Sequence, residues 1–228
     1  MRLERYRQLM LKTVAIDGPV ASGKTVVGQK LSKILDYRFL DTGTMYRAVS
    51  YIAIQDGLDY RDEDALTYLA ANIGIKLELS SDGKNLLWVR GKEISGGLRS
   101  REVELILPTV SKTTGVRVAL VEQQRSIAAE GPIVMVGRDI GTVVLKKAPV
   151  KIFLTASIEV RARRRYIEFV KQDRSATFED VKEQLISRDD VDSKRNDSPL
   201  MPDKDAFIIN TDNIEIDDVV NQILSRVK

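Results

Sequence analysis

The chain has 228 residues, of which 43% are hydrophobic and 30% charged, and its formal net charge is +3. This length and composition are ordinary for a globular protein with one domain and an insertion. Cysteine and histidine are both absent, which excludes disulfides, thiolate or imidazole metal sites, cysteine nucleophiles and Ser-His-Asp triads. Chemistry must rest on carboxylates, Lys, Arg, hydroxyls and backbone amides, which favours charge-neutralising reactions such as phosphoryl transfer.

The composition also bears on location and partners. No apolar run approaches the ~20 residues that cross a bilayer, and the charged start, residues 1–7, lacks the apolar core of a secretion signal. We therefore expect a cytoplasmic protein without a membrane partner. The small net charge and the single Trp, with no aromatics interleaved in a basic stripe, argue against a nucleic-acid partner.

The first third of the chain alternates between strands and helices. Residues 13–17 (TVAID) predict a buried strand, and a helical pattern follows at 23–35. Residues 38–40 predict a second strand, followed by a helix at 45–55. This alternation is typical of an α/β fold with an open parallel sheet flanked by helices.

The rhythm then changes. Residues 74–80 and 85–90 predict two strands joined by a hairpin turn at 81–84, and a mixed helical stretch runs on to about 124. We interpret about 60–115 as an insertion with its own small sheet.

The α/β pattern resumes in the second half. We expect strands at 132–136, 151–154 and 206–209, and helices at 157–171 and 178–192. Thr177 with Asp180 resembles a capping box at the start of the second of these helices. After the last strand, apolar residues at helical spacing predict a final helix, at Ile216, Val219, Val220, Ile223 and Leu224.

A glycine-rich motif lies between the first strand and the first helix. Residues 18–25 (GPVASGKT) fit G-x-x-x-x-G-K-[ST] in the required strand-to-helix context. Glycines permit the unusual φ angles and the close approach that bring backbone amides onto phosphate oxygens, beside the positive end of a helix. We expect Lys24 to bridge the β- and γ-phosphates and the Thr25 hydroxyl to bind Mg²⁺. The predicted ATP-binding residues are Gly18, Pro19, Val20, Ala21, Ser22, Gly23, Lys24, Thr25 and Val26.

Further polar segments follow other predicted strands. Residues 41–47 (DTGTMYR) and 137–144 (GRDIGTVV) each come directly after a strand, at the sheet edge where ligands gather. On a helix, Arg188, Asp192 and Arg195 share one face, as do Arg161, Arg164 and Arg165. Alone, the first segment is equally typical of an N-capped helix, and the Arg188 group of a salt-bridged surface. Together they suit a second anionic ligand.

In this order, the motifs closely resemble the bacterial cytidylate kinase family. The resemblance rests on IDGP at 16–19, DTGTMYR at 41–47, GRDIGTVV at 137–144, and RDDVDS at 188–193 with Arg195 and SPL at 198–200. It covers nearly everything from residue 12 onward and implies a P-loop kinase domain at 12–228. That domain would contain a monophosphate-binding insertion at about 60–115 and a helical lid at about 160–176, after an extension at 1–11 without a counterpart.

The resemblance also implies a role for individual residues. The acceptor phosphate would be held by Thr42, Tyr46, Arg47, Arg138 and Arg195. The ribose would meet Arg188 and Asp192, and the cytosine edge would be read by Arg117 and Asp139. The catalytic residues would be Lys24, Arg161 and Arg165, the last two in a lid that closes over ATP.

The expected reaction transfers the γ-phosphoryl group of ATP to CMP or dCMP, requires Mg²⁺, and is carried out by a monomer. Two positions depart from the family pattern: Ala21 stands where relatives often have Gly, and Pro108 where a serine that contacts the base is expected. Two alternatives stay open. One is a P-loop kinase for UMP, AMP or a small anionic metabolite, and the other is a nucleotide sensor without fast turnover.

Overall fold

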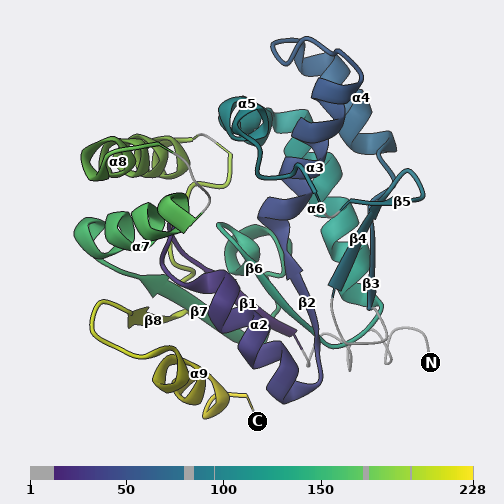
Figure 1. Cartoon of the computed structure of the whole chain (residues 1–228). Coiled ribbons are helices and arrows are strands. Elements are labelled where there is room, and N and C mark those ends of the chain that lie inside the picture. The colour runs from purple at the N-terminus through teal and green to yellow at the C-terminus, as the bar shows by residue number, and fades with distance from the viewer. Residues whose placement is uncertain (1–12, 80–84, 95, 172–174, 196, 228) are drawn as a thin grey trace, which may run out of the picture. The chain divides into compact units, whose positions relative to one another are not determined.

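The computed structural model describes residues 13–79, 85–94, 96–171, 175–195 and 197–227. The chain divides into two compact units, and Figure 1 labels their helices and strands. One comprises Val14–Asp36 with Val136–Lys228, and the other is built on Tyr37–Met135. We call them the cradle unit and the insertion unit.

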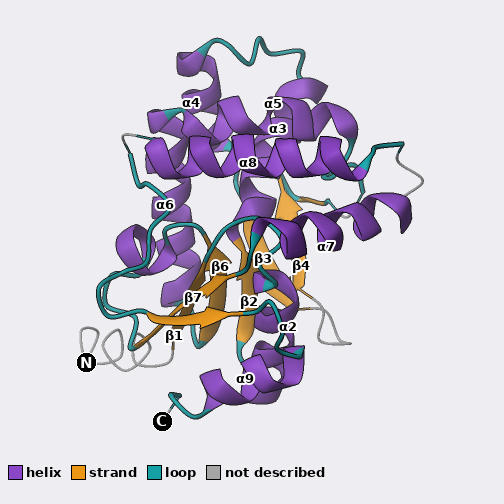
Figure 2. Ribbon diagram, turned by 90° about the vertical axis from the view of Figure 1, so that its left-hand side faces the viewer, coloured by secondary structure: helices purple, strands orange, loops and turns teal. Residues whose placement is uncertain are grey.

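The cradle unit is organised on parallel strands with the expected helices. Its elements are β1 (Thr13–Asp17), α2 (Lys24–Leu35), β7 (Val150–Thr155), α7 (Ile158–Lys171), α8 (Phe178–Lys194), β8 (Phe207–Asn210) and α9 (Ile216–Leu224). β1 pairs in parallel with β7 (Figure 2), and β7 pairs in parallel with β8. Every residue of β1 is buried, as its apolar centre predicts, and the burial includes the carboxylate of Asp17 at its end.

The strand order of the five-stranded sheet is β2-β6-β1-β7-β8, where β2 is Arg38–Asp41 and β6 is Ile133–Gly137. The order is not sequential, so crossover connections link neighbouring strands, as in other parallel sheets. The predicted α/β architecture is confirmed.

The insertion unit is mainly helical, with a small antiparallel sheet. Its helices are α3 (Thr42–Gln55), α4 (Glu63–Asn72), α5 (Arg101–Lys112) and α6 (Thr114–Ala129), and α3 packs against α5 while α4 packs against α6. The sheet has the order β3-β4-β5, formed by Lys76–Leu79, Asn85–Val89 and Lys92–Glu93. The two predicted strands are therefore confirmed, whereas the predicted turn at 81–84 lies outside the described residues.

Three local features differ from the expectation. Helix α3 begins at Thr42, three residues before the predicted start, because the Asp41 side chain accepts the Gly43 N–H at 3.0 Å and caps it. The short strand β5 was not predicted. A single π-helical turn, Ile140–Val144, follows β6 and was also not predicted.

The start of α8 and the apolar stripe of α9 were both predicted from sequence. The capping box is present: the Thr177 hydroxyl accepts the Asp180 N–H at 3.1 Å, and the Asp180 carboxylate accepts the Thr177 N–H at 2.9 Å. In α9, Val219, Val220 and Ile223 are buried and Leu224 is half-buried, but Ile216 is 42% exposed at the first helical position. Across the described ranges, no helix combines the length and apolarity needed to cross a membrane.

Candidate functional site

The glycine-rich motif adopts a cradle conformation between β1 and α2. Gly18 has φ 148° and Gly23 has φ 96°, both in the region that favours glycine. A Cβ on Gly18 would lie 2.0 Å from the Leu154 carbonyl oxygen of β7, so only glycine fits there. The Lys24 ammonium is buried and donates to the Pro19 carbonyl at 2.6 Å. The loop therefore gathers backbone and ammonium groups at the start of a helix, as phosphate binding requires.

Ala21 stands in this loop with φ 59°, the left-handed conformation that costs a non-glycine residue about 1–2 kcal/mol. Two arginines of α7 contact the same stretch of backbone. Arg161 donates to the Val20 carbonyl at 3.3 Å, and Arg164 to the Ala21 carbonyl at 3.5 Å. The first arginines of the predicted lid thus touch the cradle itself.

Three arginines of α7 contact different partners. Besides Val20, Arg161 donates to the Ala156 carbonyl at 3.0 Å and to the Asp189 carboxylate at 2.6 Å. Arg164 donates to the Thr211 hydroxyl at 3.0 Å. Arg165 pairs with Glu168 at 2.8 Å, and its guanidinium lies 4.7 Å from the centroid of the Phe169 ring. These arginines differ in partners although they share a helix.

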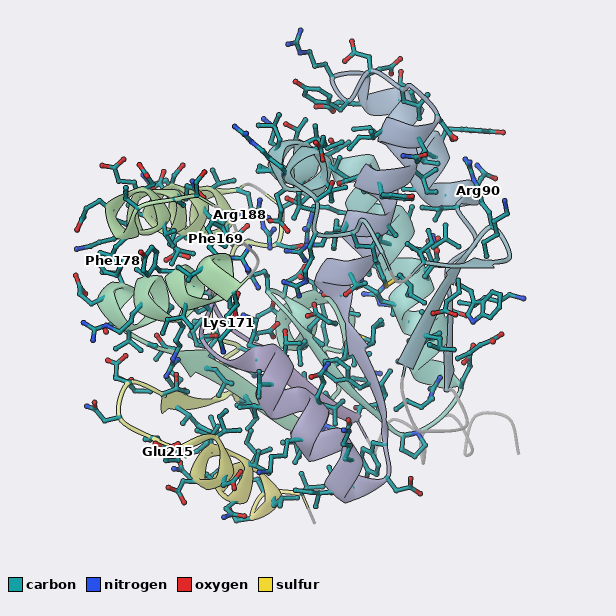
Figure 3. All side chains as sticks on the ribbon, in the orientation of Figure 1. Arg90, Phe169, Lys171, Phe178, Arg188 and Glu215 are labelled. Carbon is teal, nitrogen blue, oxygen red and sulfur yellow. The ribbon has the colours of Figure 1, made fainter. Side chains whose placement is uncertain are left out.

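A small apolar core joins α7 to α8. Ala162, Val181 and Leu185 form its buried centre, and Phe169, Phe178 and Tyr166 pack against it among others (Figure 3). Tyr166 and Phe178 meet edge to face with ring centroids 6.3 Å apart. Val20 of the cradle packs against the same core. The two helices therefore form one body that is attached to the cradle loop.

Three arginines surround Asp192 on α8. The Asp192 side chain is only 1% exposed. Its carboxylate lies 3.0 Å from Arg138, 3.4 Å from Arg188 and 3.7 Å from Arg195. Burial alone would raise the pKa of Asp192, but the three arginines outweigh burial and hold the pKa below its usual value. We call these four residues the Asp192 cluster. The predicted shared face is thus confirmed, and Arg138 from beyond β6 joins it.

The Asp192 cluster has hydrogen-bonding capacity beyond its one carboxylate. A guanidinium carries five N–H donors. Arg138 uses its Nε on Asp192 and contacts its neighbour's carbonyl, Gly137, at a long 3.4 Å. Three permanently charged groups around one buried carboxylate are suited to an anionic ligand with several acceptor oxygens.

Asp139 follows Arg138 and is 6% exposed. It precedes the π-helical turn, whose first amides, Ile140 N–H and Gly141 N–H, both donate to the Asp17 carboxylate at 2.8 Å. Burial raises the pKa of Asp17 to about 6; the two amides and Lys24 oppose the rise, and Asp139 adds to it. No sequence pattern predicted a role for Asp17, because the amides that it binds lie more than 120 residues further along the chain.

The insertion unit holds the other four predicted acceptor residues. Thr42 and Tyr46 are buried on α3, and Arg47 pairs with Glu104 at 2.9 Å. Arg117 is 4% exposed, and its guanidinium lies 5.9 Å from the centroid of the Tyr46 ring. Within this unit, the structure therefore brings Tyr46 and Arg117 together.

Pro108 lies inside α5, which continues past it. Its carbonyl accepts the Ser111 hydroxyl at 3.1 Å, and the Ser111 carbonyl accepts from Arg117 at 3.3 Å. A chain of contacts therefore runs from this departure from the family pattern to a predicted base-reading residue.

The hydroxyl of Thr25, beside the phosphate cradle, fits a magnesium ion that is held mainly by nucleotide phosphates. Thr25 is the second residue of α2 and is half-buried. Among the residues that the structure describes, no three acidic, His or Cys side chains gather into a metal-binding group. Mg²⁺ retains several waters and commonly takes only one or two protein ligands beside substrate phosphates. One hydroxyl beside a phosphate cradle is sufficient for this mode.

Comparisons with known proteins agree with this geometry. A profile of the family described as cytidylate kinase matches residues 14–228. A cytidylate kinase of Bacillus licheniformis is 41% identical over 214 residues, covering 94% of this chain and 95% of the relative. That of Bacillus subtilis strain 168 is 39% identical over 216 residues, covering 95% and 96%.

A solved structure shares the fold. It is an uncharacterized protein from Eubacterium ventriosum, with a TM-score of 0.52, 11% identity, and coverage of 94% of this chain and 97% of that one. The family profile spans both the cradle and the Asp192 cluster, and the relatives match over nearly their whole length. The chain therefore belongs to the cytidylate kinase family.

Proposed function

We propose that this chain transfers the γ-phosphoryl group of ATP to CMP or dCMP, giving ADP and CDP or dCDP. The observation that carries the proposal is the presence, in one unit, of a phosphate cradle and a separate arginine cluster around the buried Asp192. A nucleotide sensor needs one anion site. A kinase whose acceptor is itself a phosphate needs two.

The donor nucleotide would be held by residues 18–26. The loop amides and the start of α2 are suited to the β- and γ-phosphates, and Lys24 would stay with the transferring group. Mg²⁺ would bind the Thr25 hydroxyl and, when bound, would neutralise phosphate charge. The protein's part in the reaction is then to align the two anions and to exclude water.

The acceptor would be held by residues outside the phosphate cradle. We assign its phosphate to Thr42, Tyr46, Arg47, Arg138 and Arg195, and its ribose to Arg188 and Asp192. Arg117 and Asp139 would read the cytosine edge. A carboxylate at Asp139 accepts a hydrogen bond from the 4-amino group of cytosine, which uracil lacks, and a site built for such a bond rejects the analogue without it strongly.

Lys24, Arg161 and Arg165 are the proposed catalytic residues. An arginine that stabilises the transferring phosphoryl group is worth about 10³–10⁵ in rate. Arg165→Ala should therefore lower turnover by about that factor and leave ATP affinity nearly unchanged. Arg163→Ala is the matched control, because Arg163 lies on the same helix but is exposed. Equal turnover in the two variants would remove Arg165 from the mechanism.

The acceptor is tested by coupled ADP release with ATP and Mg²⁺, offering CMP, dCMP, UMP and AMP separately to wild type and to Asp139→Ala. We expect fast turnover with CMP and dCMP in wild type, and its loss in the variant. Faster turnover with UMP or AMP would retain the kinase and discard the base-reading residues. No turnover with any acceptor would reduce the function to nucleotide binding.

A further inference from the structure

Asp17 is a buried carboxylate with no place in the reaction proposed above. It is the last residue of β1, directly before Gly18 of the cradle, and is 4% exposed. Each of its two oxygens accepts one backbone amide, from Ile140 and from Gly141, at 2.8 Å. A single side chain therefore joins the cradle strand to the segment that carries Arg138 and Asp139.

The two amides that Asp17 binds would otherwise lack acceptors. The first N–H groups of any helical turn have no partner within that turn. Inside the π-helical turn, Val144 N–H reaches back to the Asp139 carbonyl at 3.1 Å and Leu145 N–H to the Ile140 carbonyl at 2.6 Å. The Ile140 and Gly141 amides precede these bonds, so Asp17 supplies the N-terminal cap of the turn from another strand.

Asp139 depends on this cap for its orientation. Its backbone angles are φ −147° and ψ 26°, outside the regular helix and strand regions. Such a conformation persists only where the surrounding structure fixes it. The residue on its C-terminal side is fixed by Asp17, and the residue on its N-terminal side, Arg138, is fixed by Asp192.

The fit between Asp17 and the turn is close. A Cβ on Gly141 would lie 3.4 Å from the Asp17 Oδ2 atom and 3.3 Å from the side chain of Lys151. The Asp17 carboxylate therefore lies beside the backbone of Gly141, at about van der Waals distance from where a side chain would begin. The charged groups that face Asp17 are Asp139 and Lys24, one from each of the segments that it joins.

Burial of this carboxylate is unfavourable for folding alone. Desolvation is the largest influence on the Asp17 pKa, which is raised to about 6, so the ionised form is disfavoured in the native state. A role confined to stability would be served better by a neutral side chain. Both carboxylate oxygens instead bind the segment directly after Arg138 and Asp139. This indicates that Asp17 positions those two residues.

We propose that Asp17 is a positioning residue for acceptor recognition, holding Arg138 and Asp139 in register with the first glycine of the ATP cradle. This inference rests on the proposed function, in which those two residues bind the acceptor. In this view, the Asp17 side chain aligns the ATP-binding loop after β1 with the acceptor-binding residues after β6.

The test uses Asp17→Asn, which keeps the size of the side chain. An amide has one acceptor oxygen, and its NH₂ group would face an N–H donor, so at most one of the two bonds survives. The control is Ile152→Val on the neighbouring strand β7, a buried change in the same sheet without polar contacts.

Two readouts are measured on the intact chain. Amide hydrogen exchange of Ile140 and Gly141 should be about tenfold faster in Asp17→Asn than in wild type, since a buried amide loses its acceptor. In steady state, KM for CMP should rise about tenfold while KM for ATP changes less than about threefold. Ile152→Val should leave both KM values and the exchange of these amides unchanged.

The outcomes separate this inference from the proposed function. A wild-type chain that does not phosphorylate CMP would refute the function, and the exchange readout would then decide the inference alone. Unchanged exchange at Ile140 and Gly141 in Asp17→Asn would overturn the inference. So would equal rises in the two KM values, because a merely structural role affects donor and acceptor alike.

Discussion

Neutralising the carboxylate of the Asp192 cluster provides a quantitative test of the site's electrostatics. Asp192→Asn keeps the shape of the side chain but leaves Arg138, Arg188 and Arg195 around an uncharged group, at distances now 3.0 to 3.7 Å from a carboxylate. Removing one partner from a buried ion pair costs about 3–5 kcal/mol. Because Arg138 is 24% exposed and water screens part of its charge, we expect a loss near the lower value, about 3 kcal/mol.

The assay is urea unfolding followed by circular dichroism. At a slope of about 2 kcal/mol/M, this loss lowers the midpoint by about 1.5 M with an unchanged slope. Asp190→Asn is the control, because Asp190 lies on the same helix and its ion pair with Lys194 is exposed, which makes it worth at most about 0.5 kcal/mol.

Two conditions sharpen this test. The pKa of Asp192 is lowered from its ordinary value of 3.8, so its contribution is fully present above that pH and is lost as pH falls through the lowered value. Wild type and variant should therefore converge in acid. Inorganic phosphate should restore part of the variant's stability at neutral pH, because it returns negative charge to the arginines. A loss at pH 7 no larger than that of Asp190→Asn would refute the reasoning.

Three further predictions concern the cradle strand and loop. Because the pKa of Asp17 is raised from 3.8 to about 6, the native state binds this proton more readily than the unfolded state between those values, and the group's contribution to stability grows as pH falls. The difference in unfolding free energy between wild type and Asp17→Asn should change by about 1 kcal/mol from pH 7 to pH 5, and a constant difference would contradict the assignment. Gly18→Ala should weaken ATP binding by about a hundredfold or more in calorimetry, because its Cβ would lie 2.0 Å from the Leu154 carbonyl oxygen; near-normal affinity would show that the loop tolerates a side chain. Ala21→Gly should leave thermal stability equal or slightly higher, because relief of the left-handed φ of 59° offsets the added chain entropy; a loss above about 1 kcal/mol would show that the alanine side chain packs favourably.

Local patterns predicted most of the fold. The buried strand β6 is apolar throughout and β1 is apolar at its centre. The capping box involves only residues 177–180, and the cradle motif carries its own strand-to-helix context. Each of these depends on residues close together in sequence. Sequence reasoning therefore recovers such features without knowledge of the tertiary structure.

The turn before β5 was missed for a conformational reason. Arg90 and Gly91 have φ 51° and 74° and connect β4 to β5, whose register pairs Val89 with Lys92. Two-residue hairpins that need positive φ at both positions usually show Asn-Gly or Asp-Gly. An arginine in the first position gives no such signal, although its side chain pairs with Asp56 at 2.7 Å.

The functional contacts that were missed are long-range. Asp17 caps a turn 123 residues later, and Arg161 pairs with Asp189 across two helices. The π-helical turn itself offers no periodic pattern, since its register depends on an acceptor from another strand. The family resemblance therefore predicted the residues of the candidate site. The long-range contacts that position those residues became visible only in the three-dimensional structure.

The most direct test of the central claim follows phosphorus by NMR in a mixture of the chain, ATP, Mg²⁺ and CMP. Our account predicts that the γ-phosphorus signal of ATP is lost as the β-phosphorus signal of CDP grows in equal amount, with little inorganic phosphate formed when CMP is omitted. Release of inorganic phosphate at the same rate with and without CMP would show that water, not CMP, is the acceptor and would contradict the account.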